Sequence, residues 1–388
     1  MRSPPNRPEP PLTSQTFIGL ISGTSMDGID AALVRFNGEE RGGAELLASH
    51  SHPLPPALHS RVMAVAHGED DRLEPLARLD VELGREFAAA ALALLEAADH
   101  TAEEITAIGS HGQTVRHLPE GEHPTTVQLG DPNTIAELTG ITTVGDFRRR
   151  DMAAGGEGAP LVPAFHAAML RDPGIERTVV NIGGIANITI LPADPTRPVR
   201  GFDTGPGNVL MDTWAGRHLG TAFDADGHWA ASGKVIPELM VAWRADPYFG
   251  REPPKSTGRE LFNPDWLARS RAPLADYEPA DVQASLCELT AVTIAEAVSA
   301  YAAGTEELLV CGGGAHNADL MARLARALSN RRVESTAAFG LDPDWVEAMA
   351  FAWLARQTLA GRPGNLPDVT GARHPVVLGG IYPGKSGK

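Results

Sequence analysis

One local pattern occurs twice in this chain of 388 residues: a short apolar strand, a polar turn rich in glycine, and a second apolar strand. The first copy has its strands at 17–21 and 31–36, and the second at 178–182 and 186–191. Helical and strand patterns alternate after each copy. This order predicts an α/β fold built by internal duplication of one unit. The length agrees, because a chain of this size usually divides its core between two lobes.

The remaining elements follow from apolar periodicity and turn residues. One helix or two are predicted over 71–98, and others over 132–139, from 209, and over 279–303, 317–329 and 344–359. Further strands are predicted over 105–109, 125–129, 142–144 and 308–311, with a polar loop at 110–113. We therefore predict a disordered tail (1–16), a first lobe (17–146) and a second lobe (147–370). A C-terminal segment, 371–388, could return to the first lobe.

Charge and cysteine content exclude several classes of protein. The chain has 33 Lys and Arg against 49 Asp and Glu, a formal net charge of −16. No nucleic-acid or membrane partner is expected, because both reward a basic surface. The two cysteines, Cys287 and Cys311, disfavour a disulfide scaffold or a zinc site and fit a reducing compartment. The proline-rich N-terminus lacks the apolar stretch of a signal peptide, so we expect a cytoplasmic protein.

The first glycine-rich turn, at 22–29, is rich in hydrogen-bond donors. Such a turn can approach phosphate oxygens closely and bind them through N–H and O–H groups. Asp27 could hold Mg²⁺, which prefers carboxylate oxygens together with phosphate oxygens. Alternatively, Asp27 and Gly28 only supply the backbone angles of a hairpin.

Two further turns make nucleotide binding the better interpretation. The turn at 181–187 again joins two strands, which by itself would also fit a plain hairpin. The turn at 312–314 follows a buried strand, where missing side chains let a ring or ribose lie against the backbone. Other nucleotide motifs are absent: 227–234 has the wrong glycine spacing for a Walker A loop. A protein-kinase catalytic loop and a G-x-S-x-G elbow are also missing.

Asp203 is the candidate general base. It lies in 201–208, which we expect as a rigid loop ahead of a helix and near a phosphate site. An Asp in this position more often caps the turn. Phosphoryl transfer needs a group that takes the proton of the nucleophile, so the neighbouring turns favour the base.

Three other polar residues have weaker support. His111 and Arg150 belong to segments 110–114 and 146–151, which follow predicted strands and could line a cleft as donors to a polyhydroxylated, carboxylated ligand. Composition alone favours a satisfied loop histidine and a solvated arginine. Glu347, on the last long helix, would by default lie on the surface.

With these residues in place, the chain resembles the anhydro-N-acetylmuramic acid kinase family, within the acetate and sugar kinase/Hsc70/actin superfamily. The resemblance runs from Phe17 to Pro383. It is carried by the motifs GLISGTSMDGIDAALV, IGSHGQTVRH, VGDFRRRDMAAGGEGAPLVPAFH, VNIGGIANI, GFDTGPGNVLMD, ASGKV, PPKSTGRE, LLVCGGGAHN and GNLPDVTGA.

The resemblance implies two RNase-H-like, actin-like ATPase lobes that close over ATP and Mg²⁺ in an interlobe cleft. The implied nucleotide contacts are Ser22, Gly23, Thr24, Ser25, Met26, Asp27, Gly28, Ile29, Asn181, Gly183, Gly184, Gly312, Gly313, Gly314 and Asn317. It implies that Asp203 is the general base. The expected sugar contacts are His111, Arg150, Asp203 and Glu347.

The implied substrate is an amino sugar, 1,6-anhydro-N-acetylmuramic acid, whose O6 is tied to C1 and offers no free hydroxyl. Asp203 would deprotonate a water that attacks C1, and the released O6 would take the γ-phosphoryl group of ATP. The products would be N-acetylmuramic acid 6-phosphate and ADP, a reaction of peptidoglycan recycling.

Two alternatives share the same turns. One is a hexose or acetate kinase of this fold, with an ordinary hydroxyl acceptor. The other is a non-catalytic ATP-binding module of the actin or Hsc70 kind, although a chaperone would add a peptide-binding domain.

We also expect a homodimer, since symmetric dimers are the commonest soluble oligomers. Segment 253–260 could contact either the substrate or a second subunit.

Overall fold

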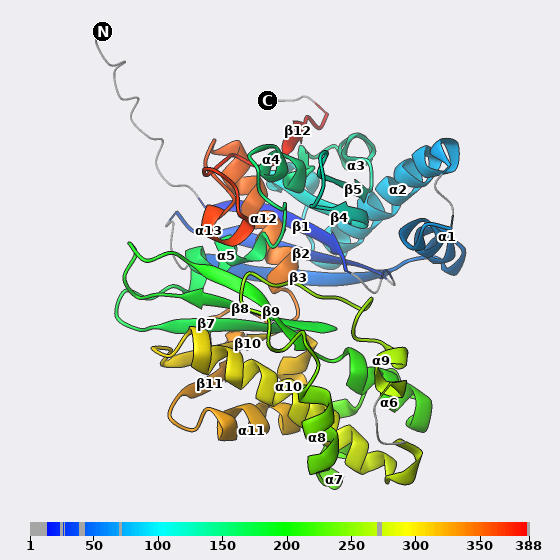
Figure 1. The fold of residues 1–388 in the computed structure, drawn as a ribbon. Coiled ribbons are helices and arrows are strands. Elements are labelled where there is room, and N and C mark those ends of the chain that lie inside the picture. The colour runs from blue at the N-terminus through cyan, green and yellow to red at the C-terminus, as the bar shows by residue number, and fades with distance from the viewer. Residues whose placement is uncertain are drawn as a thin grey trace.

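The computed structural model describes residues 14–23, 26, 28–38, 43–69, 72–269 and 274–385. Within them the chain forms two β-sheets, one above the other, with helices outside and between them (Figure 1). Of the predicted N-terminal tail, residues 1–13 lie outside the described part, and the first strand begins at Gln15. No helix in the described ranges is both long and apolar enough to cross a membrane.

The first sheet has the order β12-β6-β4-β1-β2-β3, with β5 paired to β4. β1, β2 and β3 form an antiparallel meander, and β4 and β6 continue the sheet in parallel with β1. The strands are β1 (Gln15–Ser22), β2 (Gly28–Phe36), β3 (Ala44–Pro53), β4 (Ala107–Leu118), β5 (Thr125–Leu129), β6 (Thr143–Gly145) and β12 (Gly380–Tyr382).

The second sheet repeats this plan. Its order is β9-β8-β7-β10-β11, again an antiparallel meander of three strands extended by two parallel strands. The strands are β7 (Arg177–Ile182), β8 (Ile185–Leu191), β9 (Arg200–Pro206), β10 (Glu307–Cys311) and β11 (Arg332–Ser335). The shared order confirms the predicted α/β fold with two lobes and the internal duplication.

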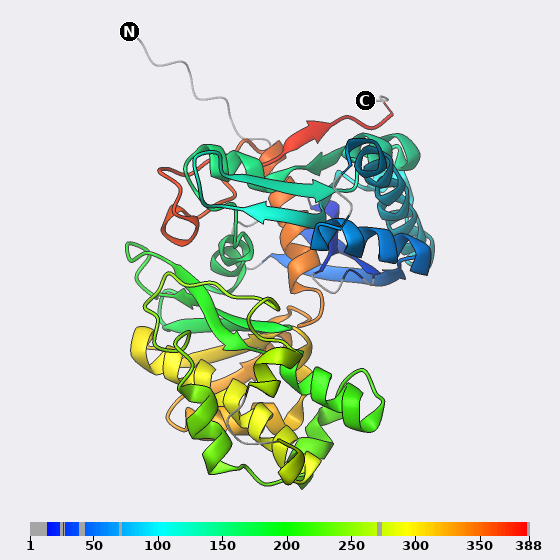
Figure 2. The ribbon, with the colours of Figure 1, turned by 45° about the vertical axis from the view of Figure 1, so that its right-hand side comes forward.

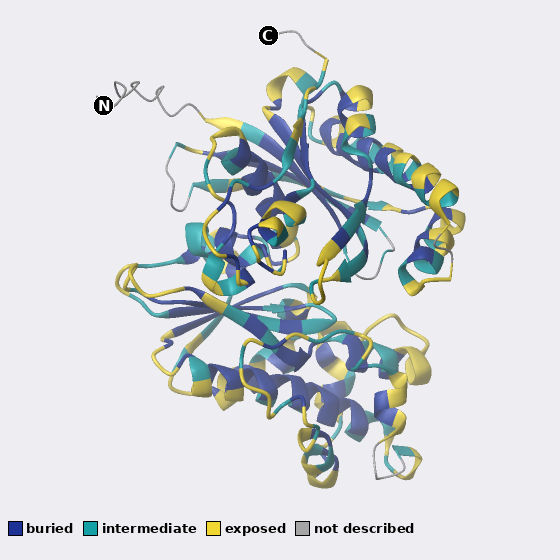
Figure 3. Ribbon diagram, turned by 45° about the horizontal axis from the view of Figure 1, so that its top comes forward, coloured by how far each residue is buried: buried dark blue, intermediate teal, exposed yellow. Residues whose placement is uncertain are grey.

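Helices cover the outer face of each sheet and leave their own outer surfaces exposed (Figure 3). The first lobe carries α1 (Pro56–His67), α2 (Leu73–Ala97), α3 (Pro132–Thr139) and α4 (Phe147–Ala153). The second carries α6 (Val209–Leu219), α7 (His228–Ser232), α8 (Pro237–Arg244), α9 (Pro264–Ala268), α10 (Pro279–Tyr301) and α11 (Ala318–Ala327). A short helix, α13 (Pro367–Thr370), contacts β9.

Side chains alternate along both sheets between an outer core and a shared middle core. Ile18 and Val180 point into the outer cores of their lobes, whereas Phe17 and Val179 point into the middle. Two helices, α5 (Val162–Leu170) and α12 (Val346–Leu359), fill the space between the sheets. The middle core therefore joins the two lobes.

Helix α12 packs on the first sheet, although it follows the strands of the second in sequence (Figure 2). Two glycines make this close approach possible, because a side chain at Gly19 or Gly109 would clash with the backbone of Ala348 or Phe351. β12 then adds to the edge of the first sheet beside β6.

Two local expectations were wrong, and two elements were not predicted. β4 continues through 110–113, where a loop was predicted, because β5 pairs with it from Gln113 onward. Segment 201–206 is part of β9 rather than a loop, since Asp203 pairs with Asn187 of β8. β3 and α1 were not predicted, and β3 is an edge strand whose burial is only partial.

Candidate functional site

A cleft of about 420 Å³ lies where the ends of β1 and β4 face the β7–β8 turn and β9. The first lobe contributes Ser22 and Gly23 at the end of β1, His111 and Gln113 of β4, Arg148 of α4 and Glu347 of α12. From the second lobe the lining residues are Asn181, Gly183, Gly184, Ile185, Asn187, Asp203, Thr257, Gly258 and Arg259. The cleft thus brings together residues from both glycine-rich hairpins and from segment 253–260.

The first turn is only partly described, and Thr24, Ser25 and Asp27 lie outside the described residues. The Ser22 hydroxyl is buried, 2.8 Å from the Gly28 carbonyl oxygen and 2.6 Å from Gln113 Oε1. Ser22 therefore joins the turn to β4. Gly23 and Met26 line the cleft, whereas the side chain of Ile29 is fully buried in the first-lobe core.

The second turn is fixed by its carbonyl groups. Gly183 and Gly184 accept hydrogen bonds of 2.8–3.1 Å from the N–H groups of Gly207, Asn208 and Val209, where α6 begins. Their own N–H groups donate no hydrogen bond within the described ranges. Both residues line the cleft, so these two donors are available to oxygen atoms of a ligand.

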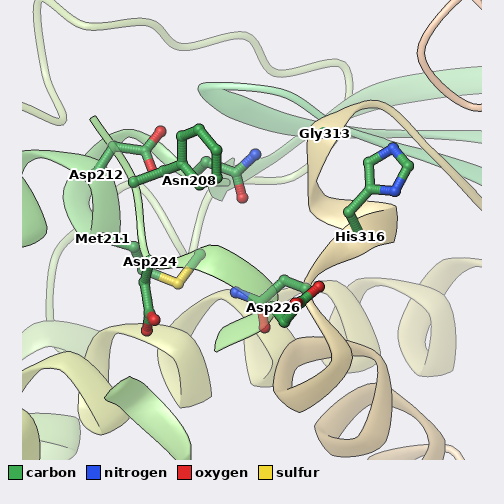
Figure 4. A pocket seen from close by; sticks show the side chains of 9 residues that line it. Asn208, Met211, Asp212, Asp224, Asp226, Gly313 and His316 are labelled. Carbon is green, nitrogen blue, oxygen red and sulfur yellow. The ribbon is translucent and has the colours of Figure 1, made fainter. Parts of the chain in front are cut away.

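The third turn borders a second cavity, of about 330 Å³, with Asn208, Asp212 and Asp224 across from it (Figure 4). Gly313 and Asn317 line this cavity. Gly312 and Gly314 instead permit close packing, because a side chain at either would meet Asn181 or Ile182. The two cavities adjoin at Asn208, whose N–H donates to the Gly183 carbonyl.

Asp203 points one carboxylate oxygen at segment 255–257. Its Oδ2 accepts hydrogen bonds from the Thr257 N–H (2.9 Å) and the Ser256 hydroxyl (3.1 Å). No described group donates to Oδ1. Burial raises the pKa of Asp203 above its ordinary value, and the two hydrogen bonds oppose this. Asp203 does not cap α6, so the capping interpretation was wrong.

A buried histidine holds an arginine on the opposite wall. His111 Nδ1 donates to the Gly112 carbonyl (2.9 Å), and its Nε2 accepts from Arg148 Nε (2.9 Å). Arg148 Nη1 also donates to the Gly158 carbonyl (3.2 Å). Burial, together with the Arg148 charge, sets the pKa of His111 well below its ordinary value. His111 is therefore neutral and orients Arg148.

Glu347 is accessible from the cleft but surrounded by protein on its other sides. Burial raises its pKa and the Asp30 charge adds to this, while Arg148 opposes both. Glu347 is exposed, as the default predicted, and the surface that it occupies is the cleft wall. Burial lowers the pKa of Arg148 to about 10, so the guanidinium stays charged at neutral pH.

Arg150 is exposed and is not among the residues that line the cleft, whereas Arg148 is. Both belong to α4, where residues two apart point in directions about 160° from each other around the helix axis. Helical periodicity therefore predicts that only one of these two arginines can face the cleft. The contact between Arg150 and a sugar stays a prediction.

Sequence reasoning also missed Thr257 and Arg259 as site residues. Both belong to the segment 253–260, for which the sequence predicts a contact with either the substrate or a second subunit. Among the described residues, no group of three His, Cys, Asp or Glu side chains could hold a metal ion.

Comparison with known proteins gives one consistent family. The model of the family "Anhydro-N-acetylmuramic acid kinase" matches residues 15–384. A protein of that name from Coxiella burnetii (strain RSA 493 / Nine Mile phase I) is 50% identical over 374 residues, which are 96% of this chain and 99% of the relative. Another, from Xanthomonas campestris pv. campestris (strain 8004), is 53% identical over 371 residues, 95% of this chain and 98% of the relative. Among solved structures, component A of the Acidaminococcus fermentans (R)-2-hydroxyglutaryl-CoA dehydratase has a TM-score of 0.48 and 13% identity, covering 89% of this chain and 100% of that one.

Proposed function

This chain belongs to the anhydro-N-acetylmuramic acid kinase family, and we propose that it performs the family's reaction with Asp203 as general base. The observation that carries this assignment is the state of the Asp203 carboxylate. One oxygen is fixed by two donors, and the other is free in the same cleft that Gly183 and Gly184 line with unused N–H groups. A base next to phosphate donors is what phosphoryl transfer from ATP requires.

The proposed reaction converts the anhydro sugar, water and ATP into N-acetylmuramic acid 6-phosphate and ADP. Asp203 Oδ1 takes a proton from water as the water oxygen bonds to C1. The C1–O6 bond breaks, and O6 keeps its electron pair and attacks the γ-phosphorus. The bond from that phosphorus to the bridging β–γ oxygen breaks, ADP leaves, and Asp203 later returns its proton to solvent.

The geometry around Asp203 suits this role. The Thr257 N–H and the Ser256 hydroxyl fix the plane of the carboxylate, so Oδ1 has one orientation. A pKa raised by burial makes the carboxylate a stronger proton acceptor than an exposed Asp. Tyr248 supports the strand by donating its hydroxyl to the Asp203 carbonyl (2.8 Å).

The nucleotide would lie across both cavities. The adenosine would occupy the cavity beside Gly313 and Asn317, and the phosphates would accept hydrogen bonds from Gly183 and Gly184. Mg²⁺, when bound with ATP, balances phosphate charge, and it would take most of its ligands from phosphate oxygens and water. Asp27 stays the proposed protein ligand, outside the described residues.

The opposite wall would hold the sugar. Arg148 offers a charged donor for the lactyl carboxylate, and Glu347 offers an acceptor for hydroxyl or amide groups. His111 would act through Arg148. Use of ATP also supports the proposed cytoplasmic location, and a homodimer is the proposed assembly.

The test is a comparison of sugars in water labelled with ¹⁸O. We expect ADP release with the anhydro sugar and much less with N-acetylmuramic acid or N-acetylglucosamine. The phosphorylated product should carry one ¹⁸O at C1, seen by mass spectrometry after rapid quenching. Product moved into labelled water after the reaction controls for exchange at C1. A preference for the open sugars, or an unlabelled product, would reject the assignment.

A further inference from the structure

We propose that Arg259 is a further catalytic residue, whose guanidinium contacts the phosphoryl group in transfer. The inference rests on the proposed kinase reaction. It gives a role to the segment 253–260, which the sequence left open between substrate and subunit contact.

Arg259 lies over the second glycine turn. A β-carbon placed on Gly184 would be 3.8 Å from both Arg259 Nε and Nη2, so the guanidinium is within contact distance of that turn. The same turn supplies the two unused N–H groups described above. A phosphate bound there would therefore be within reach of the guanidinium.

The Arg259 guanidinium has no hydrogen-bond or ion-pair partner among the described residues. The side chain is exposed, and within the described ranges it forms no hydrogen bond and no ion pair within 4.0 Å. Arg323 shows the contrast: it is buried and pairs with Glu288 and Asp319, each at 2.7 Å. The charge of Arg259 does act on the carboxyl group of Asp212. Burial raises the pKa of Asp212 to about 7, even though Arg259 opposes this increase.

The backbone around Arg259 is firmly held even though its side chain is free. Asn263 Nδ2 donates to the Arg259 carbonyl (3.0 Å), and the N–H groups of Leu261 and Phe262 donate to the Gly258 carbonyl (3.2 and 3.1 Å). Phe262 is fully buried among aromatic side chains. The side chain thus starts from a fixed backbone, so binding phosphate would order the side chain alone and not the segment that carries it.

One short segment also carries the partner of the base. Thr257 binds Asp203 through its N–H group, and Arg259 follows two residues later. The spacing between the base and the cation is therefore set by local backbone structure.

The charge of the surrounding protein also favours a role for the Arg259 guanidinium. The chain carries a net charge of −16, and Asp203, Asp212 and Glu260 all lie near this wall. Arg259 is the one basic side chain that the described second-lobe residues contribute to the cleft lining. A positioned arginine on a transferring phosphoryl group accelerates comparable reactions by about 10³–10⁵-fold.

The test compares Arg259→Met and Arg259→Lys with Arg269→Met, an exposed arginine at the end of α9 that binds the Asp265 carbonyl. We expect Arg259→Met to lower kcat by about 10²–10³-fold and Arg259→Lys to lower it less. ADP binding, measured by calorimetry, should change less than threefold. Binding of ADP with aluminium fluoride and the product sugar, which mimics the transition state, should weaken strongly. Guanidinium ion added to Arg259→Ala should restore part of the rate.

Other outcomes would overturn the proposal. A kcat of Arg259→Met within threefold of the wild type, or equal weakening of ADP and ADP–aluminium fluoride binding, would show that Arg259 does not act in the transition state. A lowered melting temperature with parallel loss of ADP binding would show a structural role. If the wild type itself fails to phosphorylate the anhydro sugar, the proposed function fails instead, and the two failures are thereby distinguished.

Discussion

The two walls of the cleft use their polar groups differently. On the first-lobe wall, His111 and Arg148 bind each other and the backbone, and Ser22 binds Gln113. On the second-lobe wall, Asp203 keeps one oxygen free, Gly183 and Gly184 keep their N–H groups free, and Arg259 is unpaired in the described structure.

This difference indicates that the first-lobe wall positions the substrate and that the second-lobe wall takes part in the chemical step. Buried polar groups normally satisfy one another, and on the first wall Glu347 is the exception, since no described group donates to its carboxylate. The other polar groups named there are satisfied, which makes that wall rigid and suited to holding a sugar. A wall that leaves donors, a carboxylate oxygen and a cation unused is prepared for groups that arrive only with the substrates. Variants of the second wall should therefore affect mainly kcat, and variants of the first mainly KM.

The largest effect is expected for Asp203→Asn. The amide oxygen can still accept the Thr257 N–H, so the fold should be kept, but the side chain can no longer take a proton. We expect kcat to fall by at least about 10³-fold. ADP release measures turnover, and calorimetry should show ATP affinity close to that of the wild type.

Asp194→Asn is the matched control, because Asp194 is exposed and its carboxylate accepts from the N–H and hydroxyl groups of the neighbouring Thr196. It should leave kcat unchanged. If Asp203→Asn kept near-normal turnover, the second wall would lose its role in the chemistry and the contrast between the walls would fail.

His111→Phe should give the next largest effect, and it should appear in KM. Phenylalanine keeps the ring contact with Phe351 (4.6 Å between ring centroids) but removes the acceptor for Arg148 Nε. A misplaced guanidinium should raise the KM of the sugar by about 10–100-fold, the cost of one charge-assisted hydrogen bond. The exposed His374→Phe serves as control. A change in kcat alone would place His111 with the chemistry.

Low pH should reduce the stability of the fold as well as the activity of the cleft residues, and the two effects need separate measurements. His166 is buried in the middle core beside the Thr189 hydroxyl (3.0 Å), and burial lowers its pKa to about 3. The unfolded chain binds the proton more readily, so stability falls as pH drops below the ordinary histidine pKa. Between about pH 6.5 and pH 5 this histidine should cost about 1.5 kcal/mol of unfolding free energy.

Urea unfolding at the two pH values measures that cost. His166→Phe should flatten the pH dependence, whereas His374→Phe should keep it. An unchanged slope in His166→Phe would mean that other groups carry the acid sensitivity of the middle core.

The sequence predicted a helix or strand well where the residues that begin and end it lie close together in the chain. The helix over 132–139 was predicted to the residue, because Asp131 caps it by accepting from the N–H groups of Asn133 and Thr134, and a proline follows the cap. Pairing between distant strands was not visible. It extends β4 beyond Gly112, despite a positive φ of 73° there, and it places Asp203 inside β9.

The site residues likewise fall into those that a local sequence pattern reveals and those that only the fold reveals. Asp203, Gly183, Gly184 and Gly313 could be selected from their local pattern, and the structure places all of them at the two cavities. Thr257 could not, because its role is a backbone N–H bonded to a residue 54 positions away. A backbone donor leaves no mark on residue type, and only the fold brings it to the carboxylate.

The smallest effect, and the finest test of the contrast, is expected for Ser256→Ala. The Ser256 hydroxyl and the Thr257 N–H both lower the pKa of Asp203, against the effect of burial. Removing the hydroxyl should raise that pKa and move the acid limb of the kcat/KM profile to higher pH, because the base is protonated sooner. At neutral pH the loss should be about two- to fivefold, the size of one weak hydrogen bond. Thr257→Ala keeps the backbone donor and should leave the limb in place. Should both variants shift the limb equally, the orientation of Asp203 would depend on the whole segment rather than on the two donors that its Oδ2 accepts.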